Sequence, residues 1–221
     1  MHDAEKAVAE KDFDELRRIG HKIKGSSAAI SAKALAKRGA RIEEDAKKHD
    51  IENIRSGFAA LKDELYEKYF QAKSAALSYL SYGLKSSKEV KDYLAKKKYS
   101  TSIQEKVVEQ FIKTGLIDDL YYAKAFTRDK LKLNHYGPIR IQMELKKKGI
   151  DEAFIDETLK EVSKEILIET AYEASIKKIH SLKNKSNFQK KQKIYQFLSY
   201  KGFDYDTIMS AWSKLQKNAN V

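Results

Sequence analysis

The feature that most constrains the fold is an internal repeat with a period close to 50 residues. Leu94, Leu145 and Leu198 lie 51 and 53 residues apart, and aligning them brings three similar segments into register. These segments are EVKDYLAKKKYSTSIQEKVV, RIQMELKKKGIDEAFIDETL and KIYQFLSYKGFDYDTIMSAW. Each contains a helix with Leu-x-x-Lys at its end, a basic stop, an apolar residue, a capping residue and a second amphipathic helix. A helical unit repeated at such a period buries its apolar face by stacking on its neighbours.

The second copy predicts one small helical unit directly from its turn residues. Apolar residues recur at helical spacing over 120–133 and again over 139–148, and Gly137-Pro138 separates the two helices. Gly149 stands where a left-handed C-cap is needed, and Asp151 stands where a third helix needs its N-cap. We therefore expect an elongated, curved array of three tandem three-helix repeats.

Two further caps are expected at helix starts in the repeats. The segment Ser86-Ser87-Lys88-Glu89 has a capping arrangement, a hydroxyl followed by an acid two or three residues later, at the start of the helix that ends near Lys98. Asp118 and Asp119 are adjacent acids, but successive helical residues do not share a face. We predict that Asp119 caps the helix that follows it.

Composition places the chain in the all-α class. It has 9 glycines and 1 proline in 221 residues, and no stretch alternates Val, Ile and Thr as a strand would. It contains no cysteine, which excludes disulfides and thiolate metal sites and fits a reducing, cytoplasmic setting. The start of the chain is charged, and no apolar run approaches the ~18 residues of a membrane span, so we expect a soluble protein with no membrane partner.

The net charge of +12 is concentrated in the repeats. Residues 1–70 contain 15 Lys/Arg against 14 Asp/Glu, whereas residues 71–221 contain 29 against 18. Eleven of the 13 tyrosines also lie in the second range. A basic surface with interspersed aromatic residues is compatible with nucleic acid or a nucleoprotein partner. For any single residue the alternative is a core tyrosine or a solvated lysine.

Residues 3–70 follow a different pattern and predict an antiparallel helical bundle with short loops. A short helical piece is expected over 3–10, followed by helices from 13 to about 30, from 31 to about 49 and from 50 to about 70; in these three, apolar residues recur every three or four positions. Nothing near 70–74 is rich in glycine or proline. The last of these helices is therefore expected to continue from Asp50 into the first repeat, as far as Tyr82.

His21, Lys24 and Gly25 lie three and four residues apart and would share one helical face. An exposed imidazole can accept a phosphoryl group, a lysine can neutralise the new charge, and glycine allows a partner's surface to come close. The segment His21-Lys22-Ile23-Lys24-Gly25-Ser26 resembles the motif of histidine-containing phosphotransfer (HPt) domains, which implies His21 as phosphoacceptor, with Lys24 and Gly25 supporting it. The first helix is shorter than that family's. The alternative is a surface histidine on a basic helix.

The segments GLIDDLYYAKAF and GPIRIQMELKKKGID resemble the central motif of the RecX family, the regulators of the RecA recombinase in DNA repair and the SOS response. ALSYLSYGLKSSKEVKDYLAKKKY resembles that family's first repeat, and the resemblance runs from about Lys73 to Lys217. It implies that the array lies in the groove of the RecA-DNA filament and suppresses ATP hydrolysis and strand exchange. The predicted domains are an HPt-like bundle, 1–70, and RecX-like repeats over 71–118, 119–166 and 167–221.

Cations at the helix ends of the repeats are candidate contacts to RecA or DNA; the alternative is ordinary C-terminal capping by lysine. A basic insert at 181–193 is predicted to be a loop and a contact segment, whereas Trp212 is expected in the core. The candidates in the repeats are Lys96, Lys97, Lys98, Arg128, Arg140, Lys146, Lys147 and Lys148. In the insert the candidate positions are 184, 186, 190 and 191. Lys190 and Lys191 are basic, whereas Asn184 and Ser186 are uncharged and each follows a lysine.

Three functions remain open from the residues. The repeats contain no phosphate loop, no metal-ligand spacing and no nucleophile-base pair, which argues against an enzyme and gives no indication of a cofactor or metal. The first hypothesis is a regulator that binds the RecA filament, with single- or double-stranded DNA as a further partner. The second is a phosphorelay protein in which His21 takes a phosphoryl group from a receiver domain and the repeats serve as output or scaffold. The third is nonspecific nucleic-acid binding.

Overall fold

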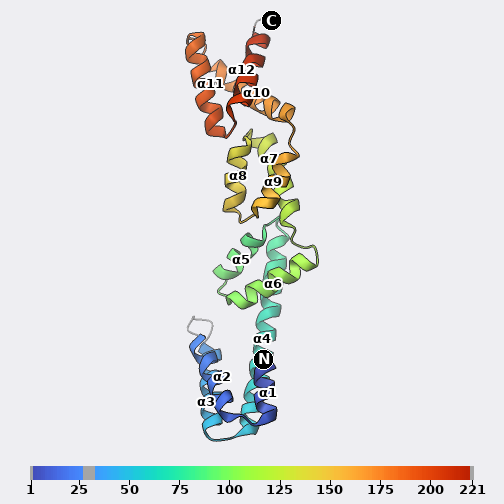
Figure 1. Ribbon diagram of the computed structural model, residues 1–221, viewed down its shortest axis with the longest axis vertical. Helices are drawn as coiled ribbons and strands as arrows, with labels where there is room; N and C mark the ends of the chain where they lie inside the picture. The colour runs from blue at the N-terminus through green and yellow to red at the C-terminus, as the bar shows by residue number, and fades with distance from the viewer. Residues whose placement is uncertain (1, 27–32, 220–221) are drawn as a thin grey trace. The chain divides into compact units, whose positions relative to one another are not determined.

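The computed structural model describes residues 2–26 and 33–219, and within these ranges the regular secondary structure is helical only (Figure 1). The expected all-α class with three tandem three-helix units is confirmed. None of the described helices is both long and apolar enough to span a membrane. The helices are α1 His2–Glu10, α2 Phe13–Ser26, α3 Lys33–Lys47, α4 Ile51–Leu80, α5 Ser87–Lys96, α6 Thr101–Lys113, α7 Asp119–Asn134, α8 Pro138–Lys147, α9 Glu152–Lys160, α10 Lys164–His180, α11 Asn187–Lys201 and α12 Tyr205–Ala219.

The chain divides into two compact units. Unit 1 comprises residues 1–83 and 91–110, and unit 2 comprises residues 84–90 and 111–221. In unit 1, α1 and α3 pack on the amino-terminal half of α4, and α2 packs on α3 and α1, around a core that includes Leu16, Ile42 and Ile54 (Figure 1). This is the helical bundle that the apolar periodicity predicts.

Two glycines set the spacing of α2 and α3 in this bundle. A Cβ added to Gly20 would lie 2.9 Å from the carbonyl oxygen of Gly39, and one added to Gly39 would lie 2.8 Å from that of Gly20. The two helix backbones are therefore in direct contact, which only residues without a side chain permit. α3 ends at Lys47 and not at 49 as expected, because His49 adopts a left-handed backbone with φ +56°. The expected stretch 27–30 of the second helix lies outside the described residues.

α4 is one uninterrupted helix of 30 residues. Asp50 caps it by accepting a hydrogen bond from the backbone N–H of Asn53, and the helix ends at Leu80, close to the expected Tyr82. Its carboxyl-terminal half buries Ala72 and Ala76, and the ring of Tyr79 stacks on Tyr93 of α5 with centroids 4.3 Å apart. The predicted continuous helix from the bundle into the first repeat is confirmed.

Unit 2 contains the second and third three-helix sets, α7 to α9 and α10 to α12. Each set has its own core. Leu131, Ile141, Leu145 and Ile155 lie in the first, together with Tyr122. The second core contains Ile194, Leu198, Phe203, Ile208 and Trp212. Trp212 is thus a core residue, as expected.

The middle helices of the three repeats end in the same way. In each, one residue takes a left-handed backbone, and the next donates its N–H to the carbonyl of a fully buried leucine. The left-handed residues are Lys98, Gly149 and Gly202, with φ of +65°, +75° and +92°, and the hydrogen bonds run from Tyr99 to Leu94, Ile150 to Leu145 and Phe203 to Leu198 at 3.2, 3.2 and 3.1 Å. The repeated sequence pattern is therefore a repeated backbone geometry.

The predicted loop at 181–193 is wrong over most of its length. α10 ends at His180, and α11 already begins at Asn187. Ser186 and Gln189 form a capping box in which each side chain accepts the other's backbone N–H at 3.3 Å. This pairing satisfies two helix-start donors and fixes the beginning of α11, so only 181–186 connects the two helices.

Candidate partner-binding surface

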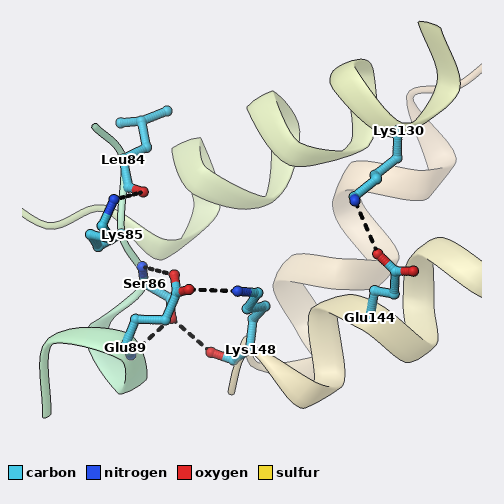
Figure 2. Close-up of polar contacts among 7 residues, drawn as sticks. All are labelled: Leu84, Lys85, Ser86, Glu89, Lys130, Glu144 and Lys148. Carbon is cyan, nitrogen blue, oxygen red and sulfur yellow. Dashed lines mark hydrogen bonds and ion pairs between the residues drawn. The ribbon is translucent and has the colours of Figure 1, made fainter. Parts of the chain in front are cut away.

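Ser86 and Glu89, at the start of the first repeat's middle helix, are joined to Lys148 at the end of the second repeat's middle helix (Figure 2). The Ser86 hydroxyl donates to the carbonyl oxygen of Lys148 at 2.7 Å, and Lys148 Nζ lies 2.5 Å from Glu89 Oε1. Glu89 also closes the predicted capping pair, because its Oε2 accepts from Ser86 N and its own N–H bonds to Ser86 Oγ. The capping residues of one repeat thus hold the next repeat as well.

Charge is well compensated at this junction. Burial of Glu89 opposes ionisation, but hydrogen bonds from Lys148 and from the backbone N–H of Ser86 outweigh it, and the pKa of Glu89 lies below its usual value. Lys148 is therefore held in place as a structural cation, and its ammonium group is less free for a partner than a surface lysine would be.

Asp119 has a different role from the one predicted. Asp118, not Asp119, caps α7, with its side chain accepting from the N–H of Tyr121. Asp119 instead accepts two hydrogen bonds from Ser87, from the N–H at 2.8 Å and from the hydroxyl at 2.5 Å. Its partner lies 32 positions earlier in the chain, so local spacing could not reveal it.

The second and third repeats meet through backbone contacts at the corresponding positions. Gly137 N–H donates to the carbonyl of Lys201 at 2.8 Å, and Ile139 N–H donates to that of Gly202 at 3.1 Å. A Cβ on Gly137 would lie 2.3 Å from the Gly202 oxygen, and a Cβ on Gly202 would lie 2.4 Å from Arg140 N. The two glycines are therefore required for this approach.

Next to this junction lies a cluster of cations and aromatic rings that sequence reasoning missed. The Arg140 guanidinium lies 3.9 Å from the ring centre of Tyr136 and 5.0 Å from that of Tyr200. Tyr200 remains 75% exposed. The pKa of Lys201 lies below its usual value, mainly because the ammonium group is partly buried and to a smaller extent because Arg140 repels it. The Nζ of Lys201 donates a hydrogen bond to the carbonyl of Asn134 at 2.7 Å. Only the adjacent Tyr200-Lys201 pair indicated this cluster in the sequence.

The candidate cations fall into two groups. Arg140, Lys146 and Lys148 have acidic partners: Arg140 Nε lies 3.5 Å from Glu144, and Lys146 Nζ lies 2.5 Å from Glu152. The second group is exposed and, over the described part of the chain, makes no ion pair: Lys96, Lys97, Arg128, Lys147 and Lys191. The cations available to a partner are therefore fewer than the sequence suggests.

The remaining candidates are less distinctive. Lys97 Nζ lies 5.7 Å from the ring centre of Tyr93, and Lys98 occupies the left-handed position at the end of α5. Lys190 is half-buried in the first turns of α11. Positions 184 and 186 carry Asn184 and Ser186 and provide no charge; the lysines of this connection are Lys183 and Lys185, and Ser186 instead caps α11.

His21 lies in the bundle with its side chain 74% exposed. Its Nδ1 is 3.5 Å from Glu43 Oε2, and the same carboxylate lies 3.9 Å from Lys24 Nζ and 3.5 Å from Lys47 Nζ. Burial raises the pKa of Glu43, but Lys47, Lys24 and His21 together lower it below its usual value. His21 and Lys24 thus share a face as predicted, Gly25 lies in the same helix, and Glu43 is a neighbour that the motif does not contain.

The fold defines the class: an all-α protein built from tandem three-helix domains. Family models for the first, second and third three-helix domains of RecX match residues 72–111, 118–159 and 165–212, in that order. The chain belongs to the RecX family. A family model of the Hpt domain matches residues 1–68.

Similar proteins agree with this family. The regulatory protein RecX of Finegoldia magna is 36% identical over 161 residues, which are 66% of this chain and 75% of that protein. RecX of Leuconostoc mesenteroides is 38% identical over 136 residues, which are 62% of this chain and 51% of its relative. The crystal structure of RecX from Lactobacillus salivarius matches 68% of this chain and 98% of its own at 30% identity, with a TM-score of 0.64. The alignments to the Leuconostoc and Bacillus cytotoxicus relatives span 51% and 61% of those proteins.

Proposed function

We propose that this protein is a cytoplasmic regulator that binds the RecA-DNA filament and inhibits its ATPase and strand-exchange activities. The observation that carries the proposal is the presence of all three RecX three-helix domains in order over 72–212. The three domains share the geometry of their helix ends, and hydrogen bonds join neighbouring repeats. Within each compact unit, these features support a fixed spacing between the side chains that would contact a partner.

Exposed cations without acidic partners supply the attraction. Lys96 lies at the end of α5, Lys147 at the end of α8 and Lys191 on α11, and none forms an ion pair over residues 2–26 and 33–219. Such groups attract acidic protein surfaces and DNA phosphates, and attraction between exposed charges is screened by salt. Binding to the filament should therefore weaken steeply as the salt concentration rises.

The test is the ATPase activity of RecA on single-stranded DNA, measured with and without the full chain. The parent protein should inhibit at low salt, and the Lys96→Glu, Lys147→Glu double variant should need at least about tenfold more protein for the same inhibition. Arg17→Glu with Lys37→Glu is the matched control, because it changes the net charge equally at exposed positions in the bundle. Absence of inhibition by the parent, or inhibition that persists unchanged at several-fold higher salt, would contradict the proposal.

A phosphorelay role of the whole chain is less well supported. The Hpt match and the exposed His21 favour a phosphotransfer origin for the bundle. However, the carboxylate of Glu43 already lies beside His21 and shares the two lysines that would neutralise a phosphoryl group. Incubation with a phosphorylated receiver domain separates the cases: transfer to the parent but not to His21→Gln would support the relay.

A further inference from the structure

The third repeat contains a long basic segment without acidic residues. Residues 174–203 include eight lysines but no Asp or Glu. They comprise the end of α10, the connection and all of α11. Lys183, Lys185 and Lys191 are exposed, and none of them makes an ion pair with another residue in the described part of the chain. Positive charge on this segment is therefore available to a partner.

Three acids border the segment in the sequence, and two of them already have partners. Glu173 Oε2 lies 3.7 Å from His135 Nδ1, and Asp204 accepts a hydrogen bond from the backbone N–H of Thr207 at 2.7 Å. Asp206, in the first turn of α12, is exposed. Eight lysines against these three acids leave the segment and its borders with a net positive charge.

Two aromatic rings of α11 are exposed on the same segment. Phe188 exposes 77% of its surface and Tyr195 exposes 39%. The core of the repeat uses Ile194 and Leu198 of this helix and neither of these rings. Exposed rings on a basic surface are typical of proteins that stack on unpaired bases.

Phe188, Lys191 and Tyr195 lie three and seven positions apart and therefore share one face of α11. The two rings are separated by about 10 Å along the helix axis. The ring of Tyr195 also meets that of Tyr205 edge-on, with centroids 6.1 Å apart. Phe188, Lys191 and Tyr195, which we call the α11 face, thus present a ring, a cation and a second ring in order.

We propose that the α11 face, with Lys183 and Lys185 of the connection, binds single-stranded nucleic acid. Bases stack on Phe188 and Tyr195, and the lysines contact the phosphates. Charge alone would attract any polyanion, but the rings favour a strand with unpaired bases. A duplex keeps the faces of its bases inside its own stack, and an acidic peptide of glutamates has no planar groups to cover the rings. The site acts on a free strand and does not depend on the proposed inhibition of RecA.

The experiment measures binding of a fluorescent oligothymidylate of about 12 nucleotides to the full chain by fluorescence anisotropy, without RecA. An abasic strand with the same number of phosphates should bind at least about tenfold more weakly, because it offers no bases to the rings. Phe188→Ala and Tyr195→Ala should each weaken oligothymidylate binding by about fivefold or more and leave binding of the abasic strand unchanged. The control Tyr121→Ala removes an exposed ring of α7 and should leave both affinities within about twofold.

The lysines are tested through the dependence of binding on salt. Each phosphate contact on a single strand contributes about 0.7 to the slope of log affinity against log salt concentration. Lys183→Gln with Lys191→Gln should therefore reduce the slope by about 1.4, whereas the two ring variants should leave it unchanged. Lys160→Gln with Lys164→Gln changes the net charge equally at exposed positions outside 174–203 and should also leave the slope unchanged.

Four results would overturn the proposal. They are absence of oligothymidylate binding, equal affinity for the abasic strand, equal or higher affinity for a duplex of the same length, and an equal loss of affinity in Tyr121→Ala. Polyglutamate that competes with the strand at equal affinity would also overturn it and would assign the face to an acidic protein. Because the assay contains no RecA, each of these results leaves the inhibition of the RecA ATPase to its own test.

Discussion

Three glycine-to-alanine variants measure how closely the second and third repeats are joined. At Gly115 the backbone is left-handed, with φ +71°, but nothing lies within 4 Å of an added Cβ. At Gly137 the backbone is extended, with φ −85°, but the Cβ would lie 2.3 Å from the Gly202 oxygen. Gly202 combines both features, with φ +92° and a Cβ that would lie 2.4 Å from Arg140 N.

The expected costs follow from these differences. Gly115→Ala should lower the free energy of unfolding by about 1 kcal/mol, the cost of a left-handed alanine. Gly137→Ala has no such cost but must displace backbone atoms, and overpacking of this kind typically costs about 1–3 kcal/mol. Gly202→Ala should cost about 2–4 kcal/mol, because both effects apply.

Urea unfolding followed by far-UV circular dichroism gives the order of stability, and Gly115→Ala is the internal control for backbone strain. Native-state hydrogen exchange of the Ile139 amide, which donates across the junction to Gly202, reports local opening. This amide should exchange faster in the Gly137 and Gly202 variants than in Gly115→Ala. A Gly137→Ala protein as stable and as well protected as Gly115→Ala would refute the close contact between these repeats.

Three further predictions concern the first junction. Lys148→Met should lower the free energy of unfolding by about 1–2 kcal/mol, because it leaves Glu89 without its cation. The control Lys147→Met, at an exposed site without an ion pair, should change this free energy by less than about 0.5 kcal/mol. Equal effects of the two variants in urea unfolding would contradict this prediction. The pKa of Glu89 is lower in the folded protein than in the unfolded chain. Its contribution to stability is therefore complete above the unfolded-state pKa and is lost as the pH falls through the folded-state pKa. Across this acidic range, the unfolding midpoint should fall less steeply in Glu89→Gln than in the parent protein. Asp119→Asn, which weakens two hydrogen bonds from Ser87, should cost about 1–2 kcal/mol in the same assay, and an unchanged midpoint would show that these bonds carry no stability.

Local sequence signals predicted the parts of the fold that depend on neighbouring residues. The capping pair of Ser86 and Glu89, the left-handed Gly149 and the Asp151 cap all involve partners within a few positions. The uninterrupted helix α4 followed from the absence of glycine and proline near its centre. Helix starts and stops are short-range features, and one sequence contains enough information to place most of them.

The parts that could not be predicted depend on residues far apart in the chain. Lys148 has the same local surroundings as its exposed neighbour Lys147, but Glu89, from the preceding repeat, pairs with only one of them. Asp119 was assigned to the nearest helix start although its partner is Ser87. The capping box that begins with Ser186 was hidden in a basic, polar segment that has the composition of a loop. Pairing across a junction depends on how the helices pack, and composition does not encode that packing.

The uninterrupted course of α4 fixes an angular relation between the bundle and the helix's own second half. Each residue of an α-helix advances the chain by about 1.5 Å and turns it by about 100°. One residue inserted between Tyr66 and Phe70 would therefore swing His21 about a quarter turn around the axis relative to Ala76, while both ends of the helix keep their own packing. Seven inserted residues would nearly restore the original azimuth. Activity that varies with the phase of such insertions, and not with their length alone, would reveal a partner that contacts both halves at once.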